Sequence, residues 1–156
     1  MSVYPVSTAL HREWAADLTP NRLYALLRLR TEVFVLEQRS FYQDLDGRDL
    51  TPSTRHFWIA SGAPDQDVPL AYLRLLEESD GSFRIGRVCT ARDARGTGLS
   101  RRLMAAALAE IGDRESVLDA QVQVVDLYRG FGYETEGEPF DEDGIMHITM
   151  RRPASR

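Results

Sequence analysis

The sequence contains no lysine, so arginine supplies all 19 of its basic side chains. It has one cysteine, Cys89, which excludes an intrachain disulfide and a cysteine cage for a metal, and we expect no metal cofactor. Apolar runs are short: the run at 33–36 is far from the length that spans a bilayer. The opening segment MSVYPVSTAL has neither the basic start nor the apolar centre of a signal peptide. These absences predict a reduced, cytoplasmic protein with no membrane partner.

Charge and length set two further limits. The chain has 24 acidic against 19 basic residues, for a formal net charge of −5. A general nucleic-acid binder normally shows a basic face, so we expect no nucleic-acid partner. The 156 residues suit one compact domain, and neither a repeat nor a linker divides them. We therefore expect residues 1–156 to form a single domain.

Two long helices are predicted. The first is expected over 20–37, because Thr19 suits the N-cap, Pro20 suits the first helical position, and apolar residues then recur with a helical period. The second begins at Leu99 and ends before Gly112, which is typical of a helix C-terminus. A polar loop separates the first helix from the strands that follow it.

Strands are expected on both sides of the second helix. Before it, three runs are typical of strands, at 56–60, 70–76 and 83–90. After it, the run at 117–123 predicts a strand that continues into a short helix, and two closing strands are expected at 133–135 and 145–150. The opening stretch is compatible with an edge strand that holds Ala9, Leu10 and Trp14. This order indicates an α/β layout around a mixed sheet.

The segment 87–100, RVCTARDARGTGLS, indicates an anion site. A strand ends and a helix begins within it, and the first turn of a helix offers free N–H groups and the positive end of the helix dipole. Gly96 and Gly98 allow the backbone to approach the anion closely, while Arg92 and Arg95 can add positive charge. The segment therefore predicts a cradle for phosphate groups, in particular for a pyrophosphate.

Two common phosphate-binding motifs do not fit this segment. A Walker P-loop needs a lysine, which the chain lacks. A dinucleotide fingerprint needs a third glycine where Arg101 stands. Both failures argue against an ATP-binding or NAD-binding enzyme.

The segment instead resembles motif A of the GCN5-related N-acetyltransferases (GNAT), R/Q-x-x-G-x-G/A. Arg95, Gly98 and Ser100 stand at its three defined positions, with the small Ser100 in place of glycine or alanine. The resemblance implies that the strand before the motif splays from its neighbour and that its backbone binds pantetheine. The acyl-CoA-binding residues implied in this way are Val88, Cys89, Thr90, Arg95, Gly96, Thr97, Gly98, Leu99 and Ser100.

A second segment, LYRGFGY at 127–133, resembles motif B of the same family, L-Y-x-x-x-G-F/Y. The resemblance implies that Tyr128 is the acid that protonates the leaving CoA thiolate, which a phenol can do. The alternative is that Tyr128 only packs its ring against the sheet.

Two further stretches resemble the ElaA-type branch of the family. Residues 27–50 follow its pattern L-R-x-x-V-F-V-x-E-Q-x-x-x-Y-x-D/E-x-D-G-x-D, and residues 140–150 resemble its closing D-G-I-x-H-I-x-M. The chain departs from the branch at Ser40 and Phe41, where Cys-Pro is common. The resemblance runs from residue 22 onward and implies a GNAT-like α/β fold, with a mixed, mostly antiparallel sheet flanked by helices.

The function predicted from these resemblances is acyl-CoA-dependent N-acyl transfer. Acetyl-CoA is expected as the co-substrate and a primary amine of a small molecule or peptide as the acceptor; a homodimer is compatible with the sequence. The alternative is a catalytically silent acyl-CoA sensor or protein-interaction module on the same fold. His147 is either the base that deprotonates the amine or a structural histidine, and the Cys89 thiol and His56 are expected to be structural.

Acidic residues cluster in two loops. Asp44, Asp46 and Asp49 do not fit an EF-hand, because that alignment puts Tyr42 first and Ser53 twelfth. They belong either to a solvated loop or to one wall of a cationic acceptor site. The same two interpretations apply to Glu37, Asp141, Glu142 and Asp143. With the net charge of −5, these loops predict a cationic amine as the acceptor.

Overall fold

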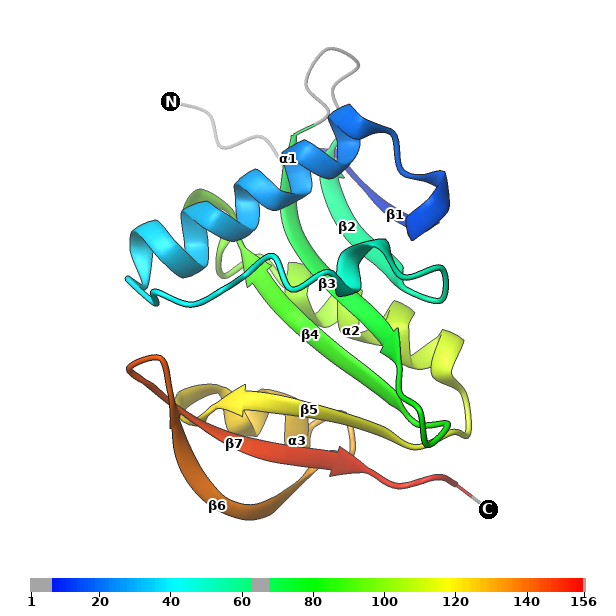
Figure 1. The fold of residues 1–156 in the computed structure, drawn as a ribbon, viewed down its shortest axis with the longest axis vertical. Coiled ribbons are helices and arrows are strands. Elements are labelled where there is room, and N and C mark those ends of the chain that lie inside the picture. The colour runs from blue at the N-terminus through cyan, green and yellow to red at the C-terminus, as the bar shows by residue number, and fades with distance from the viewer. Residues whose placement is uncertain (1–6, 63–67, 156) are drawn as a thin grey trace.

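The computed structural model describes residues 7–62 and 68–155. Seven strands form one sheet in the order β1-β2-β3-β4-β5-β7-β6. Helix α1 lies across one face of this sheet, and helices α2 and α3 lie on the other (Figure 1). No helix within the described residues is long and apolar enough to cross a membrane.

The helices and strands follow one another in the predicted order. The strands are β1 (Thr8–Trp14), β2 (Arg55–Ser61), β3 (Pro69–Glu77), β4 (Phe83–Thr90), β5 (Ser116–Gln121), β6 (Glu134–Glu142) and β7 (Ile145–Arg152). The helices are α1 (Pro20–Arg30), α2 (Leu99–Ile111) and α3 (Val125–Arg129). The predicted α/β class is confirmed, as is the edge strand near the start of the chain, which is β1. One boundary was wrong: β6 runs on to Glu142, so most of the second acidic loop is strand.

The first helix changes type along its length. Thr19 caps α1 by accepting a hydrogen bond from the Arg22 N–H (3.1 Å), as expected for this residue before Pro20. The α-helix ends at Arg30 and continues as a π-helical segment, η2 (Thr31–Glu37). Such wide turns are rare and occur frequently at functional sites. Together α1 and η2 cover the predicted range 20–37.

Two cores hold the layers together, one on each face of the sheet. Neighbouring residues of β2 alternate between them: Phe57 and Ile59 pack with α2, whereas Trp58 and Ala60 pack with α1. Strand geometry causes this alternation, because successive side chains point to opposite faces. Since both faces are covered, β2 and β3 are almost wholly buried.

The sheet opens between its two central strands. β4 and β5 pair in parallel only at Phe83–Ser116 and Arg84–Val117, and they diverge beyond those two pairs. On its other edge, β4 has an irregularity in its pairing with β3, near Arg87, whose φ is +54°. The splay implied by the family resemblance is therefore present. It leaves the backbone of β4 up to Thr90 unpaired on the side of β5.

Candidate active site

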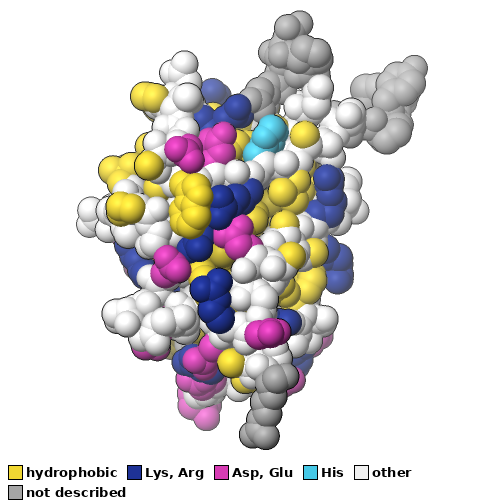
Figure 2. Space-filling view, turned by 90° about the vertical axis from the view of Figure 1, so that its right-hand side faces the viewer, with side chains coloured by type: hydrophobic (Ala, Val, Ile, Leu, Met, Phe, Trp, Pro, Cys, Tyr) yellow, Lys and Arg dark blue, Asp and Glu magenta, His cyan; other side chains and the backbone are white. Residues whose placement is uncertain are grey.

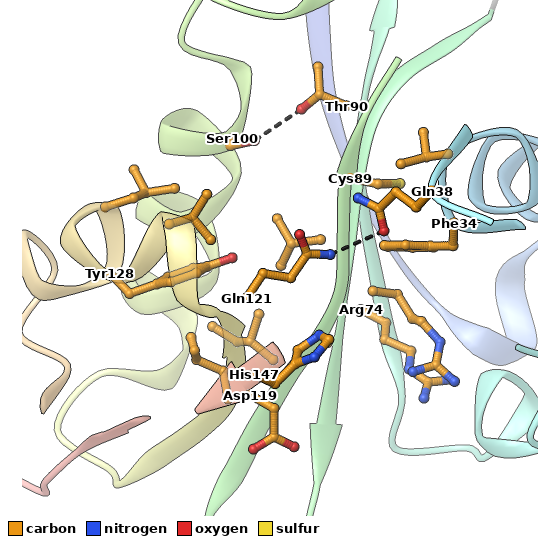
Figure 3. A pocket seen from close by; sticks show the side chains of 18 of the residues that line it. Phe34, Gln38, Arg74, Cys89, Thr90, Ser100, Asp119, Gln121, Tyr128 and His147 are labelled. Carbon is orange, nitrogen blue, oxygen red and sulfur yellow. Dashed lines mark hydrogen bonds between the residues drawn. The ribbon is translucent and has the colours of Figure 1, made fainter. Parts of the chain in front are cut away.

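The splay of β4 and β5 opens a cavity of about 480 Å³. Its walls come from β4 and β5, from η2, from the start of α2, and from β7 and Tyr128 (Figure 3). All but one of the predicted acyl-CoA-binding residues line it, together with both predicted catalytic residues; Thr97 is the exception. The cavity thus brings together residues separated by more than half of the chain.

The start of α2 forms the predicted anion cradle. Gly96 (φ +77°) and Gly98 (φ +81°) both adopt the left-handed backbone conformation, which glycine adopts without strain. A Cβ at either glycine would meet nothing within 4 Å, so the backbone conformation and not crowding favours glycine here. No side chain caps the helix, which leaves its first N–H groups available to an anion. The hydroxyl groups of Ser100 and Thr90 share a hydrogen bond (3.0 Å).

The Arg95 side chain lines the cavity, but its guanidinium is paired with other groups of the protein. Its terminal nitrogens donate to both carboxylate oxygens of Glu37 (2.7 Å for one of them), and its Nε donates to the Thr90 carbonyl (3.1 Å). The guanidinium therefore ties the end of η2 to the loop before α2. Its hydrogen bond to Glu37 also lowers the pKa of that carboxyl group.

Tyr128 lies near the C-terminal end of α3 and lines the cavity. Its side chain is 6% exposed, and its hydroxyl points into the cavity, toward the side where Gln121 lies (Figure 3). Its ring packs edge-on against Tyr133 at 6.4 Å. Burial raises the pKa of Tyr128 to about 12, so the phenol keeps its proton at neutral pH. The geometry is compatible with both the catalytic and the packing interpretation, since the ring packs against Tyr133 while the hydroxyl faces the cavity.

His147 projects from β7 into the same cavity. Its Nδ1 lies 2.8 Å from the Ile145 carbonyl oxygen. A carbonyl only accepts, so Nδ1 carries the proton and Nε2 of the neutral ring has a free lone pair. The Glu142 carboxylate lies 3.6 Å from Nε2, and the ring stacks on Phe140. His147 can therefore accept a proton at Nε2.

Cys89 and His56 have structural surroundings. Burial raises the pKa of the Cys89 thiol to about 12, so the thiol is a poor nucleophile. His56 is fully buried between the Tyr72 hydroxyl (2.7 Å) and the Asp49 carbonyl (2.9 Å), and burial lowers its pKa.

The three carboxylates of the acidic loop 44–49 pair with arginines, which neither sequence interpretation predicted, although Leu45, Asp46 and Gly47 are themselves exposed. Asp44 and Asp49 are buried against Arg30, whose side chain is 0% exposed, at 3.1 and 2.6 Å. Asp46 and Asp49 also pair with Arg74, at 2.6 and 3.0 Å. Arginines that the sequence analysis did not single out thus neutralise all three carboxylates. Arg74 had a sequence signal, as an arginine within the mostly apolar β3, whereas Arg30 is one of three arginines in α1 and does not stand out there.

This network predicts a loss of stability in acid. Its hydrogen bonds to Arg74 lower the pKa of Asp46; for Asp49, burial opposes the effect of Arg30 and Arg74, but the net pKa is also lowered. Such carboxylates stabilise the fold above their unfolded pKa of about 3.9, and that contribution is lost as pH falls toward the folded value. In thermal unfolding from pH 7 to about 2.5, we expect the Tm of Asp46→Asn to decline less steeply below about pH 4 than that of the wild type. Parallel curves would contradict the prediction.

A glutamine pair spans the cavity, and the sequence analysis did not identify it. The Gln121 amide donates to Gln38 Oε1 (3.1 Å), which joins the end of β5 to the residue after η2. In Figure 3, Thr90 and Ser100 lie on one side of this bridge, and His147 lies with Asp119 on the other. The bridge therefore marks the boundary between the phosphate cradle and the remaining part of the cavity.

The surface shown in Figure 2 mixes basic and acidic side chains and gathers neither sign into a large patch. Pairing of opposite charges is widespread in this protein; for example, Glu110 pairs with both Arg12 and Arg55 at 2.8 Å. Within residues 7–62 and 68–155, no group of three or more His, Cys, Asp or Glu side chains is arranged to hold a metal.

The fold, the splayed strands and the cradle define the class of protein. Residues 16–153 match the acetyltransferase (GNAT) domain family, and the chain belongs to that family. Its relatives place it in the ElaA-type branch. ElaA of Escherichia coli is 38% identical over 145 residues, which cover 88% of this chain and 91% of ElaA. A UPF0039 protein of Mycobacterium tuberculosis H37Rv is 51% identical over 153 residues, which cover 96% of each chain.

Two solved structures are similar over nearly their whole length. An acyl-CoA N-acyltransferase from Pseudomonas aeruginosa has a TM-score of 0.85 at 41% identity, covering 94% of this chain and 99% of that one. The crystal structure of E. coli ElaA has a TM-score of 0.84 at 34% identity, covering 93% and 99%. These likenesses confirm the predicted GNAT fold and branch.

Proposed function

We propose that the protein transfers an acetyl group from acetyl-CoA directly to a primary amine. The observation that carries this proposal is the splay of β4 from β5 directly beside the uncapped start of α2. One cavity then offers a phosphate cradle and an unpaired strand edge, which together suit the two ends of an acyl-CoA. Membership of the GNAT family supports the acyl-CoA co-substrate.

The backbone of residues 95–100 would hold the pyrophosphate. Since the Arg95 guanidinium is bound to Glu37, the free N–H groups of α2 and the helix dipole provide most of the attraction. The unpaired edge of β4 at Val88, Cys89 and Thr90 would bind the pantetheine arm and place the thioester carbonyl beside it. A backbone N–H near Cys89 would then stabilise the oxyanion.

The chemical steps follow from this placement. The neutral amine attacks the thioester carbonyl, a C–N bond forms, and the C–S bond breaks to release the CoA thiolate. Tyr128 gives its proton to that sulfur, and His147 accepts the proton that the amine loses. The acceptor enters on the far side of the glutamine bridge, where Glu142 and Asp143 offer negative charge to its ammonium form.

The first test is a calorimetric titration with acetyl-CoA, with ATP and NAD as controls. We expect one-to-one binding of acetyl-CoA alone, at roughly micromolar Kd or about −8 kcal/mol. Ser100→Glu places a carboxylate in the first turn of α2; it should keep the fold, because acids suit that position, and weaken acetyl-CoA binding at least tenfold by repelling the phosphates. Absence of binding to the folded wild type would contradict the proposal.

Binding alone does not distinguish an enzyme from an acyl-CoA sensor. Amine-dependent release of free CoA thiol does, because a sensor would bind acetyl-CoA without releasing thiol. We expect release in the presence of an accepted amine and none with the amine omitted.

The role of His147 has its own test. His147→Gln removes the proton acceptor and should lower kcat by about 10- to 100-fold, while the Kd for acetyl-CoA stays unchanged. The measurement pairs thiol-release kinetics with a thermal melt. An unchanged kcat together with a lowered Tm would assign His147 a structural role instead.

A further inference from the structure

The part of the cavity beyond the glutamine bridge has one strongly basic wall. Arg48, Arg74, Arg84 and Arg87 line it, from the loop before β2 and from β3 and β4. The carboxylates that pair with these arginines, apart from Asp119, do not line the cavity: Asp44, Asp46, Asp49 and Glu78 lie behind the wall. The wall therefore presents guanidinium groups to whatever molecule fills this part.

Two of these guanidiniums are held in place and keep unused donors. Arg84 donates from Nη1 to Asp119 (3.1 Å), and its Nη2 donates no hydrogen bond to any residue within the described ranges. Arg87 pairs through Nε with Asp44 (2.8 Å) and lies over the Tyr42 ring, 5.0 Å from its centroid. Its Nη1 likewise makes no hydrogen bond with the part of the chain that the structure describes. Fixed guanidiniums with free N–H groups suit a carboxylate.

The opposite wall has the complementary character. His147, on β7, faces Arg74 of the basic wall across the cavity (Figure 3), while Asp119, on β5, also lines the cavity and pairs with Arg84 at 3.1 Å. Glu142 and Asp143 add negative charge on the same side as His147. The cavity beyond the bridge is thus dipolar, with donors on one wall and a proton acceptor and carboxylates on the other.

We propose that the acceptor is a free α-amino acid, bound by its carboxylate at Arg84 and Arg87 with its amine toward His147. This inference rests on the proposed function and specifies its acceptor. A zwitterion matches both walls, because its carboxylate suits the arginines and its amine suits the opposite wall. A polyamine has no carboxylate and would place positive charge beside the guanidinium groups that face the cavity. The small volume, which the pantetheine arm must share, also favours a small acceptor.

The test compares acceptors that differ only in the carboxylate. Thiol release at saturating acetyl-CoA is measured for the twenty amino acids and for their decarboxylated counterparts, such as lysine with cadaverine and arginine with agmatine. We expect at least one amino acid to be turned over with kcat/KM at least tenfold above its counterpart. Equal or faster turnover of the amines, or turnover of no amino acid by protein that binds acetyl-CoA, overturns the inference. Failure to bind acetyl-CoA overturns the proposed function itself.

Variants then assign the carboxylate site. Arg84→Met should bring the ratio of kcat/KM between acid and amine close to one, and Arg84→Lys should restore part of it, because the charge returns without the planar fork. Arg28→Met is the matched control: it removes the same charge from an exposed helix face, where Arg28 pairs with Glu32. The control should keep the wild-type ratio. If the ratio of kcat/KM between acid and amine is unchanged in Arg84→Met, Arg84 does not bind the carboxylate.

Discussion

Replacing Tyr128 by Phe is expected to lower kcat by about 10²-fold or more and to leave the Kd for acetyl-CoA unchanged. The substitution removes one oxygen from a ring that is 6% exposed and otherwise keeps its packing. Thiol-release kinetics give kcat, and calorimetry gives Kd. An unchanged kcat would show that Tyr128 only packs.

Tyr133→Phe is the matched control for this experiment. The Tyr133 hydroxyl hydrogen-bonds the Ser116 hydroxyl at 2.7 Å, inside the core and away from the cavity. Its loss should lower stability by about 1 kcal/mol and leave kcat within about twofold of the wild type. Comparing the two variants separates the loss of an acid from the loss of any buried phenol.

The pKa of Tyr128 is consistent with its proposed role. Burial raises it to about 12, which in water would make the phenol too weak an acid for a thiolate. Burial also raises the pKa of the Cys89 thiol to about 12. The thiolate is likewise the charged form, so desolvation of a CoA thiol in the cavity would raise its pKa in the same direction as that of Tyr128.

The second large effect is expected on stability. Arg30→Met leaves the buried carboxylates of Asp44 and Asp49 without their main partner, and breaking a buried ion pair in this way typically costs about 3–5 kcal/mol. For a chain of this size, that corresponds to a Tm lower by about 6–20 °C. Urea denaturation followed by circular dichroism measures the change.

Arg28→Met serves as the control within the same helix. Its side chain is 73% exposed and forms an exposed ion pair with Glu32, so its loss should change the free energy of unfolding by less than about 0.5 kcal/mol. If Arg30→Met is within 1 kcal/mol of the wild type by the same measurement, the network around Arg30 does not stabilise the fold as argued here.

The fold was predictable from the sequence because its signals are local. Thr19 and Pro20 set the start of α1 within one turn, and the glycines of 96–98 set the turn before α2. The strands β2, β3 and β4 were predictable from the apolar composition of their own segments. The π-helical continuation of α1 was not predictable, because the same apolar period suits either type of helix.

The parts of the site that were missed depend on distant residues. Glu37 and Arg95 are 58 positions apart, and Gln38 and Gln121 are 83 apart. In the sequence, Asp44 and Asp49 resemble solvated loop residues, because nothing local shows that Arg30 will point toward them. The sequence shows how many charged side chains there are, but the fold determines which of them form ion pairs.

The divergence of β4 from β5 also has a consequence for the unbound chain. The other neighbouring strands of the sheet pair over most of their length, but here the pairing stops after two residue pairs, and the amides of β4 beyond them are unpaired on the side of β5. A slender, amide-bearing molecule in the gap would act as a surrogate strand and supply the missing rungs. Binding of the substrate would then also complete the sheet, and the ligand would connect the part that ends in β4 to the part that begins with β5.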